Sequence, residues 1–126
     1  MRLLIAEDSS EFLQTLLAFL RRVRGIEVAG TVGSVALLPD FVRRTPAEVL
    51  LLDVTLEDGT SLPLLQSGAI PPYLSTVVMT SHPSVGLQQE ALQLGAALFV
   101  DKETGLPGLM EWLRGMASAD GVVSSD

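Results

Sequence analysis

Three acidic side chains stand out in this sequence because each follows an apolar run of strand length. Glu7 and Asp8 come directly after the run at residues 3–6, and Asp53 comes directly after the run at residues 49–52. Unbroken apolar runs of this length are typical of strands buried on both faces of a parallel sheet. Because sites in open α/β sheets lie outside the carboxyl ends of the strands, we expect the three carboxylates to share one edge.

The chemistry that suits such a cluster is phosphoryl transfer with a divalent cation. Neighbouring carboxylates repel one another, and their pKa values rise unless a cation neutralises them. Mg2+ is commonly held by one or two carboxylates with water and phosphate oxygens, and a carboxylate nucleophile beside it forms an aspartyl phosphate. Asp53 alone would serve equally well as a helix cap. The acidic pair Glu7-Asp8 is what favours a site.

The elements that must position these side chains alternate between strand and helix. Strands are expected at residues 2–6, 27–32, 49–52, 76–79 and 96–100. Helices are expected from residue 9 or 10 to about 24, and at 34–44, 61–67, 85–94 and 106–117. Pro39 should give the second helix an irregular start or a kink. Five alternations predict right-handed crossovers onto one parallel sheet, which is an α/β fold.

Further polar groups follow the last two predicted strands. Thr80 and Ser81 end the fourth strand, and Lys102 comes after the fifth. Taken singly, Thr80 is an ordinary strand residue and Lys102 an ordinary surface lysine. Their places at strand ends nevertheless bring them to the edge that carries the acids, where a hydroxyl and an ammonium would bind a phosphoryl group.

Composition limits the kind of protein this is. The 126 residues make one domain, and a net charge of −7 argues against direct nucleic-acid binding by the domain. The absence of cysteine and the single histidine exclude a disulfide framework and zinc sites built from thiolates or several histidines. With no signal-peptide pattern and no apolar stretch of about 18 residues, we expect a cytoplasmic protein with no membrane partner.

Together, these motifs resemble the receiver domain of bacterial two-component response regulators. The resemblance rests on Glu7-Asp8, Asp53 within the segment 50–59, Thr80, and Lys102 within Phe-Val-Asp-Lys. It implies a flavodoxin-like (βα)5 fold, doubly wound, with five parallel strands in the order 2-1-3-4-5 and helices on both faces. The domain would span residues 1–118, and residues 119–126 would form a flexible tail or the start of a linker.

The same resemblance implies a phosphoacceptor and a metal site. Asp53 would accept a phosphoryl group from a sensor histidine kinase, a phosphotransfer protein or a small phosphodonor. Asp8, Asp53 and the backbone carbonyl of Thr55 would bind Mg2+, and Glu7 would act through water. The sequence departs from the family pattern at Glu57, where proline is usual.

Three residues would carry the response to phosphorylation. Thr80 would bond a phosphoryl oxygen, and Lys102 would pair with the phosphate. Phe99, three residues before that lysine, matches the switch aromatic of the family. Movement of Thr80 and Phe99 would then alter the surface made by the fourth helix, the fifth strand and the fifth helix.

The resemblance implies a signalling domain that assists its own phosphoryl transfer and dephosphorylation, and not an enzyme. Glu103, where proline is frequent in the family, and the residues after it look like receivers that precede a helix-turn-helix output domain. A DNA-binding output domain outside these residues and a homodimer formed on phosphorylation are therefore partners that the resemblance leaves open. The cognate kinase is not identified by the residues.

Three other functions remain as alternatives. A phosphatase of the haloacid dehalogenase type needs an aspartate two residues after its nucleophile, where this sequence has Thr55. A flavin-binding flavodoxin-like module needs a loop rich in hydroxyls and glycine after the first strand, where Glu7 and Asp8 stand. A receiver that only binds partners, without phosphorylation, would not need the full set of site residues.

Overall fold

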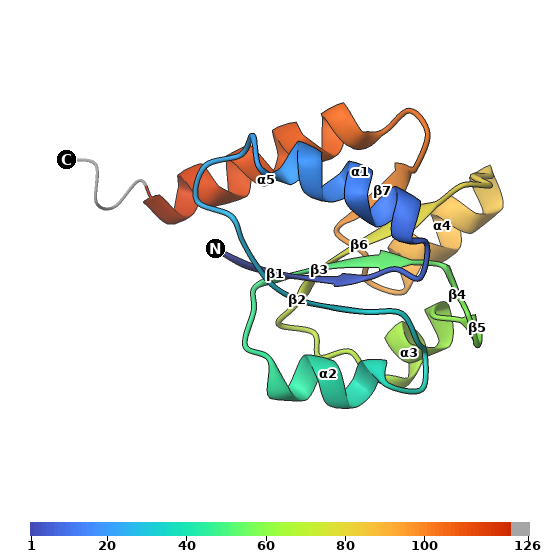
Figure 1. The fold of residues 1–126 in the computed structure, drawn as a ribbon. Coiled ribbons are helices and arrows are strands. Elements are labelled where there is room, and N and C mark those ends of the chain that lie inside the picture. Colours follow the sequence, from blue (N-terminus) through green and yellow to red (C-terminus); the bar gives the residue numbers. More distant parts are fainter. Residues whose placement is uncertain (122–126) are drawn as a thin grey trace.

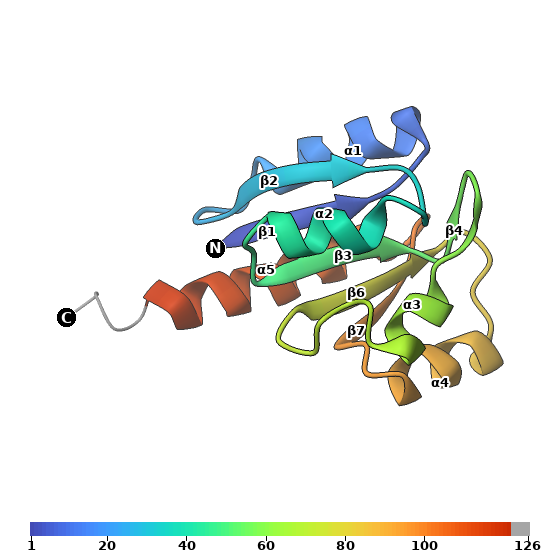
Figure 2. The same ribbon diagram turned by 90° about the horizontal axis from the view of Figure 1, so that it is seen from below.

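The protein is a doubly wound α/β sandwich in which helices cover both faces of a five-stranded parallel sheet (Figures 1 and 2). The computed structural model describes residues 1–121. The sheet order is β2-β1-β3-β6-β7, which confirms the predicted order of the five strands. Its strands are β1 (Arg2–Ala6), β2 (Glu27–Val32), β3 (Val49–Asp53), β6 (Ser75–Thr80) and β7 (Leu98–Asp101). The helices are α1 (Ser10–Leu20), α2 (Leu38–Arg44), α3 (Leu62–Ser67), α4 (Val85–Gln93) and α5 (Leu106–Gly121).

The central strand β3 organises the core because its side chains are buried on both faces. Leu51 packs with α1 and α5 on one face, while Leu50 and Leu52 pack with α2 on the other. All three are fully buried, and burying one leucine stabilises the fold by about 1.5–3 kcal/mol. The neighbours of β3 are β1 and β6, so whatever ends these three strands lies at the centre of the sheet edge.

Two of the helices that flank this edge are capped by serine side chains. Ser9 Oγ accepts a hydrogen bond from the Phe12 N–H at 3.2 Å at the start of α1. Ser84 Oγ accepts one from the Leu87 N–H at 3.1 Å at the start of α4. Each cap satisfies an otherwise unpaired helix donor and fixes where the chain turns from the loop into the helix.

The structure corrects three predicted helix boundaries. Helix α1 ends at Leu20 and not near residue 24, and turns follow it up to Gly25. Helix α2 begins at Leu38 and not at residue 34, because Pro39 fits only the first turn of a helix, where its missing N–H is not needed. Helix α5 continues to Gly121, beyond the predicted end near Ala117. Residues 122–126 lie outside the described residues, so the tail or linker remains a prediction.

A small antiparallel hairpin after β3 was not predicted. It pairs β4 (Thr55–Leu56) with β5 (Gly59–Thr60), and the turn between them contains Asp58. The Leu56 side chain is buried in the cluster under α2, while the rest of the hairpin is exposed. The hairpin therefore stands on the sheet edge directly beside the end of β3.

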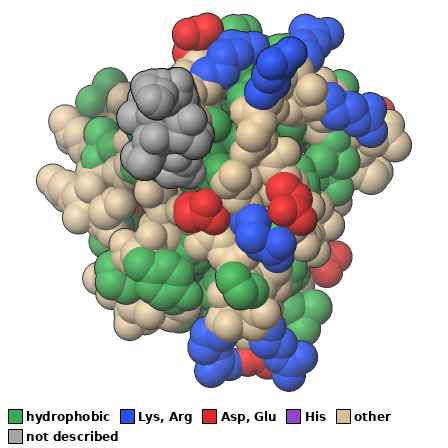
Figure 3. Space-filling model, turned by 90° about the vertical axis from the view of Figure 1, so that its left-hand side faces the viewer, with side chains coloured by type: hydrophobic (Ala, Val, Ile, Leu, Met, Phe, Trp, Pro, Cys, Tyr) green, Lys and Arg blue, Asp and Glu red, His purple; other side chains and the backbone are tan. Residues whose placement is uncertain are grey.

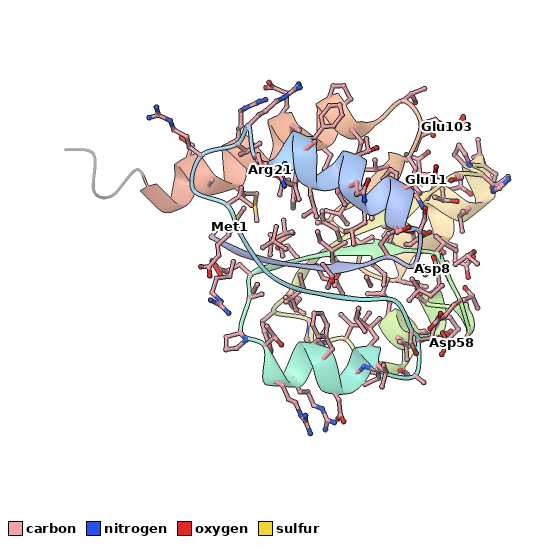
Figure 4. All side chains as sticks on the ribbon, in the orientation of Figure 1. Met1, Asp8, Glu11, Arg21, Asp58 and Glu103 are labelled. Carbon is pink, nitrogen blue, oxygen red and sulfur yellow. The ribbon has the colours of Figure 1, made fainter. Side chains whose placement is uncertain are left out.

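The arginines gather at one edge of the sheet, whereas acidic side chains lie at both edges and include Glu27 and Glu48 beside Arg2. The acids at the carboxyl edge include Asp8, Glu11, Asp58 and Glu103, all at the right-hand end of Figure 4. Figure 3 shows the opposite edge, which bears several basic side chains. The seven arginines lie at or near that opposite edge, in β1, after α1, at the end of α2 and in α5: Arg2, Arg21, Arg22, Arg24, Arg43, Arg44 and Arg114.

Within residues 1–121, no helix is both long enough and apolar enough to cross a membrane.

Candidate functional site

The three predicted carboxylates meet at the carboxyl edge of the sheet. Glu7 and Asp8 follow β1, and Asp53 ends the adjacent strand β3. One oxygen from each of the three lies within 4.8 Å of the others. Glu7 and Asp53 are buried while Asp8 is exposed, so the cluster opens to solvent on the Asp8 side.

Lys102, which follows the edge strand β7, also contacts the cluster. Its Nζ lies 2.8 Å from Asp53 Oδ2 and 2.9 Å from Glu7 Oε1, and only 9% of its side chain is exposed. The ammonium also lies 4.3 Å from the centre of the Phe12 ring, a cation–π geometry. The only lysine in the sequence is thus held between two buried carboxylates and an aromatic face.

Burial and ion pairing shift the pKa of Glu7 in opposite directions, and the same holds for Lys102. Burial raises the pKa of Glu7, although the Ser9 N–H and the Lys102 ammonium both favour its ionised form. For Lys102, burial alone would lower the pKa, but the hydrogen bonds to Asp53 and Glu7 outweigh it and raise the pKa above its usual value. Lys102 is therefore charged at neutral pH.

The Asp53 residue is held by bonds at both carboxylate oxygens and at its backbone. Its Oδ1 accepts a hydrogen bond from the Thr55 N–H at 3.2 Å, and its Oδ2 accepts one from Lys102. The backbone oxygen of Asp53 accepts a hydrogen bond from Ser61 Oγ at 2.7 Å. These contacts fix the direction of the carboxylate before any ligand binds.

A shallow pocket of about 200 Å³ opens beside this carboxylate, and it brings together most of the predicted site. The Thr80 side chain is buried, and its Oγ1 accepts a hydrogen bond from the His82 N–H at 3.0 Å. A larger cavity of about 540 Å³ lies at the arginine edge and contains none of the predicted site residues. The pocket at the site is lined by Asp53, Thr55, Thr80, Ser81, His82 and Lys102.

Phe99 is the predicted functional residue that lies apart from both this pocket and the carboxylate cluster. It lies on β7 opposite Val78 of β6 and is half-buried against the small core cluster that contains Ala91 of α4. Its ring therefore belongs to the layer between the sheet and α4, two residues in register from the strand end at Thr80.

The residues present suit a hard divalent cation. Three carboxylates against one ammonium leave two uncompensated negative charges when all are ionised. Glu7 Oε1 is buried with no hydrogen bond of good geometry, although the ammonium lies close to it. An all-oxygen donor set with a solvent-facing side is the environment that Mg2+ prefers.

No family model matches the chain. Two curated relatives align with about 80% of it. The alginate biosynthesis transcriptional regulatory protein AlgB of Pseudomonas syringae pv. tomato is 30% identical over 102 residues, which is 22% of its own length. A protein-glutamate methylesterase/protein-glutamine glutaminase of Xanthomonas oryzae pv. oryzae is 32% identical over 103 residues, which is 29% of its length. The chain thus spans less than a third of either relative.

Similar solved structures identify the fold. The chain is a flavodoxin-like α/β domain of the CheY-like type: the CheY-like receiver domain of Methanospirillum hungatei matches 94% of it with a TM-score of 0.77 at 20% identity, over 94% of that chain. More particularly, the receiver domain of the stress response regulator RcsB from Escherichia coli matches 94% of it with a TM-score of 0.82 at 21% identity, over 94% of that chain. The predicted resemblance to response-regulator receiver domains is therefore confirmed.

Two features of the site were missed from the sequence. The direct contact of Lys102 with Glu7 was not predicted, because Glu7 was expected to act through water. The ring of Phe12 beneath the ammonium was assigned only to the apolar face of α1. The available signal was its place in the first turn of α1, four residues after Asp8.

Proposed function

We propose that this chain is a phosphoacceptor receiver domain that takes a phosphoryl group on Asp53 and signals through the surface of α4, β7 and α5. The observation that carries the proposal is the fixed carboxylate of Asp53, which is paired with Lys102 and faces the pocket beside two further acids. A domain built only to bind partners would have no need of a buried lysine between two buried carboxylates.

In the reaction, an Asp53 oxygen attacks the phosphorus of the donor. The new O–P bond forms as the bond from phosphorus to the donor nitrogen or oxygen breaks, and that atom leaves with the electron pair. Phosphoryl transfer is mainly positioning and neutralisation of charge on the equatorial oxygens. Lys102 supplies one positive charge, and the Thr80 hydroxyl supplies a hydrogen-bond donor at the pocket wall.

Asp8, Asp53 and the backbone carbonyl of Thr55 would hold Mg2+, with Glu7 contributing through water. When bound, the ion neutralises negative charge on the phosphoryl oxygens. The residues of the chain itself do the remaining work: Thr55 and Lys102 orient the nucleophile, and Ser61 anchors the strand end that carries it.

The signal passes from Thr80 to Phe99. A phosphoryl group adds about −1.5 to −2 charges at pH 7 and new acceptor oxygens, so it favours a conformation in which Thr80 and Lys102 approach it. Phe99 packs between the sheet and α4, so a shift of the Thr80 segment changes the space available to its ring. Val85 and Leu92 of α4 are exposed apolar residues on the surface that would respond.

The partners that fit this function are a sensor histidine kinase or phosphotransfer protein in the cytoplasm and an output domain. RcsB from Salmonella enterica, a similar structure with a TM-score of 0.79, is bound to a promoter in the presence of a phosphomimetic. A DNA-binding output domain and a phosphorylation-dependent homodimer therefore belong to the proposal. The role is regulatory, and the domain turns over only its own phosphoryl group.

The test is to incubate the protein with Mg2+ and acetyl phosphate and to map the labelled residue by mass spectrometry. Label is expected at Asp53 alone and should be lost in Asp53→Asn. Glu57→Gln is the matched control, because Glu57 is an exposed acid four residues further on in the neighbouring hairpin. Label that persists at the normal level in Asp53→Asn would overturn the proposal.

A further inference from the structure

Asp58, at the turn of the β4–β5 hairpin, binds a loop more than twenty residues away in sequence. Its Oδ1 accepts a hydrogen bond from the Val35 N–H at 2.7 Å. Its Oδ2 accepts bonds from Ser34 Oγ at 2.9 Å and from the Ala36 N–H at 3.0 Å. All three donors lie in the connection between β2 and α2, so one carboxylate joins two loops of the site edge.

The hairpin that carries Asp58 also carries one side of the pocket. Thr55 pairs with Thr60 across the hairpin, and its N–H donates to Asp53. Leu56 anchors the hairpin in the core with only 2% of its surface exposed. The base of the hairpin is closed by the bond from the Ser61 N–H to the Val54 oxygen at 2.8 Å. Asp58 is the remaining anchor, at the outer end.

The loop that Asp58 binds runs beside the acidic pair. The Glu7 N–H donates to the Val32 oxygen at 2.8 Å. Gly33 packs so closely that a Cβ placed there would lie 3.5 Å from the Asp8 Cα and 3.5 Å from the Glu7 backbone oxygen. The bonds of Asp58 therefore tie the loop behind Asp8 to the loop that holds Thr55, across the carboxylate cluster.

We propose that Asp58 is a positioning residue that sets the spacing between the Asp8 side and the Thr55 side of the site, and so determines how tightly the site binds a divalent cation. Asp58 touches neither Asp53 nor the pocket, and it acts only through the two loops. This inference rests on the proposed function to the extent that the cation is the one used in phosphoryl transfer.

The chemistry of the contact requires a carboxylate. Three donors converge on its two oxygens, and an ionised carboxylate is an acceptor at both. An asparagine keeps the shape but turns an amide N–H2 toward at least one of these donors. Asp58→Asn should therefore open the contact with little change in volume, while Ser34→Ala removes one donor and leaves the two backbone bonds.

The first measurement is Mg2+ affinity, determined by NMR titration of wild type, Asp58→Asn, Ser34→Ala and Glu57→Gln. Loss of a direct partner of a metal ligand typically changes affinity by 10–100-fold. Asp58 acts through the two loops, so Asp58→Asn should weaken Mg2+ by about tenfold, at the low end of that range, and Ser34→Ala by less. Glu57→Gln is the matched control, since it removes the same charge from the same hairpin and Glu57 is exposed. It should stay within about twofold of wild type, because solvent and salt screen an exposed charge that does not join the two loops.

Hydrogen exchange on the same proteins separates positioning from local structure. The amides of Val35 and Ala36 should exchange faster in Asp58→Asn, and urea unfolding should show that the variant is folded. Faster exchange at these amides with unchanged Mg2+ affinity would overturn the proposal, as would equal affinities of Asp58→Asn and Glu57→Gln or a wild type that binds no Mg2+.

Phosphorylation then distinguishes this inference from the proposed function. The rate with acetyl phosphate should fall in Asp58→Asn at low Mg2+ and recover at saturating Mg2+, since the reacting groups are untouched. A rate that stays low at saturating Mg2+ would contradict positioning through the cation. If wild type binds Mg2+ and Asp58→Asn weakens it, yet Asp53 is never labelled, then the proposed function fails and the positioning role stands.

Discussion

The ammonium of Lys102 lies 2.8 Å from Asp53 Oδ2, in a pair that is almost completely buried. The same ammonium reaches Glu7, so one cation compensates two carboxylates that would otherwise repel each other. In the proposed reaction the phosphoryl group forms on the carboxylate that Lys102 already holds. The lysine therefore stabilises the resting protein and is in place for the charge that arrives.

Loss of this lysine should destabilise the protein in a way that Mg2+ partly reverses. Removing one partner of a buried ion pair typically costs about 3–5 kcal/mol, because a buried charge is left unpaired. We expect Lys102→Met to lose about that much without metal, and the gap to wild type should narrow in Mg2+. Urea unfolding, followed by fluorescence of the single tryptophan, Trp112, measures both. A variant as stable as wild type without metal would contradict the expectation.

The control is Arg114→Met, which breaks an exposed pair. Arg114 and Glu111 lie 3.1 Å apart with 46% and 78% of their side chains exposed. Such pairs contribute about 0–1 kcal/mol. Since pairing raises the pKa of Lys102, its contribution is complete below the ordinary lysine pKa of about 10.4 and is lost as pH rises through the higher folded value.

Asp8 should control metal affinity. Its loss should not destabilise the metal-free protein, in contrast to the loss of Lys102. It is the exposed member of the acidic cluster, and neutralising it removes repulsion with Glu7 and Asp53. Asp8→Asn should therefore unfold at the same or a higher urea concentration than wild type without metal, and bind Mg2+ about tenfold or more weakly. Calorimetric titration with Mg2+ tests this, and equal affinity in the two proteins would refute the assignment.

Thr80→Ala should separate phosphorylation from its consequence. The variant keeps Asp53 and Lys102 but loses a hydrogen bond to a charged group, worth roughly 1.5–3 kcal/mol, which is enough to reverse a balanced equilibrium. NMR with and without beryllofluoride should show shifts across residues 85–115 in wild type but mainly near Asp53 in the variant. Thr104→Ala, an exposed threonine on the same edge, should behave as wild type. Equally extensive shifts in Thr80→Ala would mean that the signal takes another route.

The contribution of Asp58 to stability should disappear in acid. Hydrogen bonds from the Val35 and Ala36 amides hold the pKa of Asp58 below its usual value. Its contribution is therefore present above the ordinary value of about 3.9 and is lost as pH falls through the lower folded pKa. The difference in unfolding free energy between wild type and Asp58→Asn should be constant near neutral pH and shrink below about pH 3.9. A difference that persists in acid would show that the carboxylate charge is not what binds the loop.

Much of the fold could be predicted because short apolar runs indicate which segments form buried strands. The run at residues 49–52 predicted a strand buried on both faces, and Leu50, Leu51 and Leu52 are fully buried there. The strand ends then brought Glu7, Asp8 and Asp53 to one edge without any knowledge of the loops. Pro39 correctly marked an irregularity, but the geometry it imposes moved the start of α2 to Leu38.

The rest depends on contacts between segments that no local pattern reveals. The β4–β5 hairpin has two residues in each strand, too few for an alternation to be recognised. The bonds of Asp58 to residues 34–36 depend on two loops meeting across the edge, and an Asp-Gly pair indicates only a turn. The contact of Lys102 with Glu7 likewise depends on how a side chain that follows β7 reaches past the ends of β6 and β3 to the end of β1.

All seven arginines lie at or near one edge of the sheet, and the acidic cluster with Glu11, Asp58 and Glu103 lies at the other, so the molecule has a permanent electric dipole along its strands. A phosphodonor protein with a basic docking surface would be oriented by this field so that it meets the acidic edge first, and its encounter rate would fall as salt rises. A small anionic donor such as acetyl phosphate would be repelled from the same edge, and salt would speed its approach. Opposite responses to ionic strength would thus separate a protein donor from a metabolite donor at one and the same aspartate.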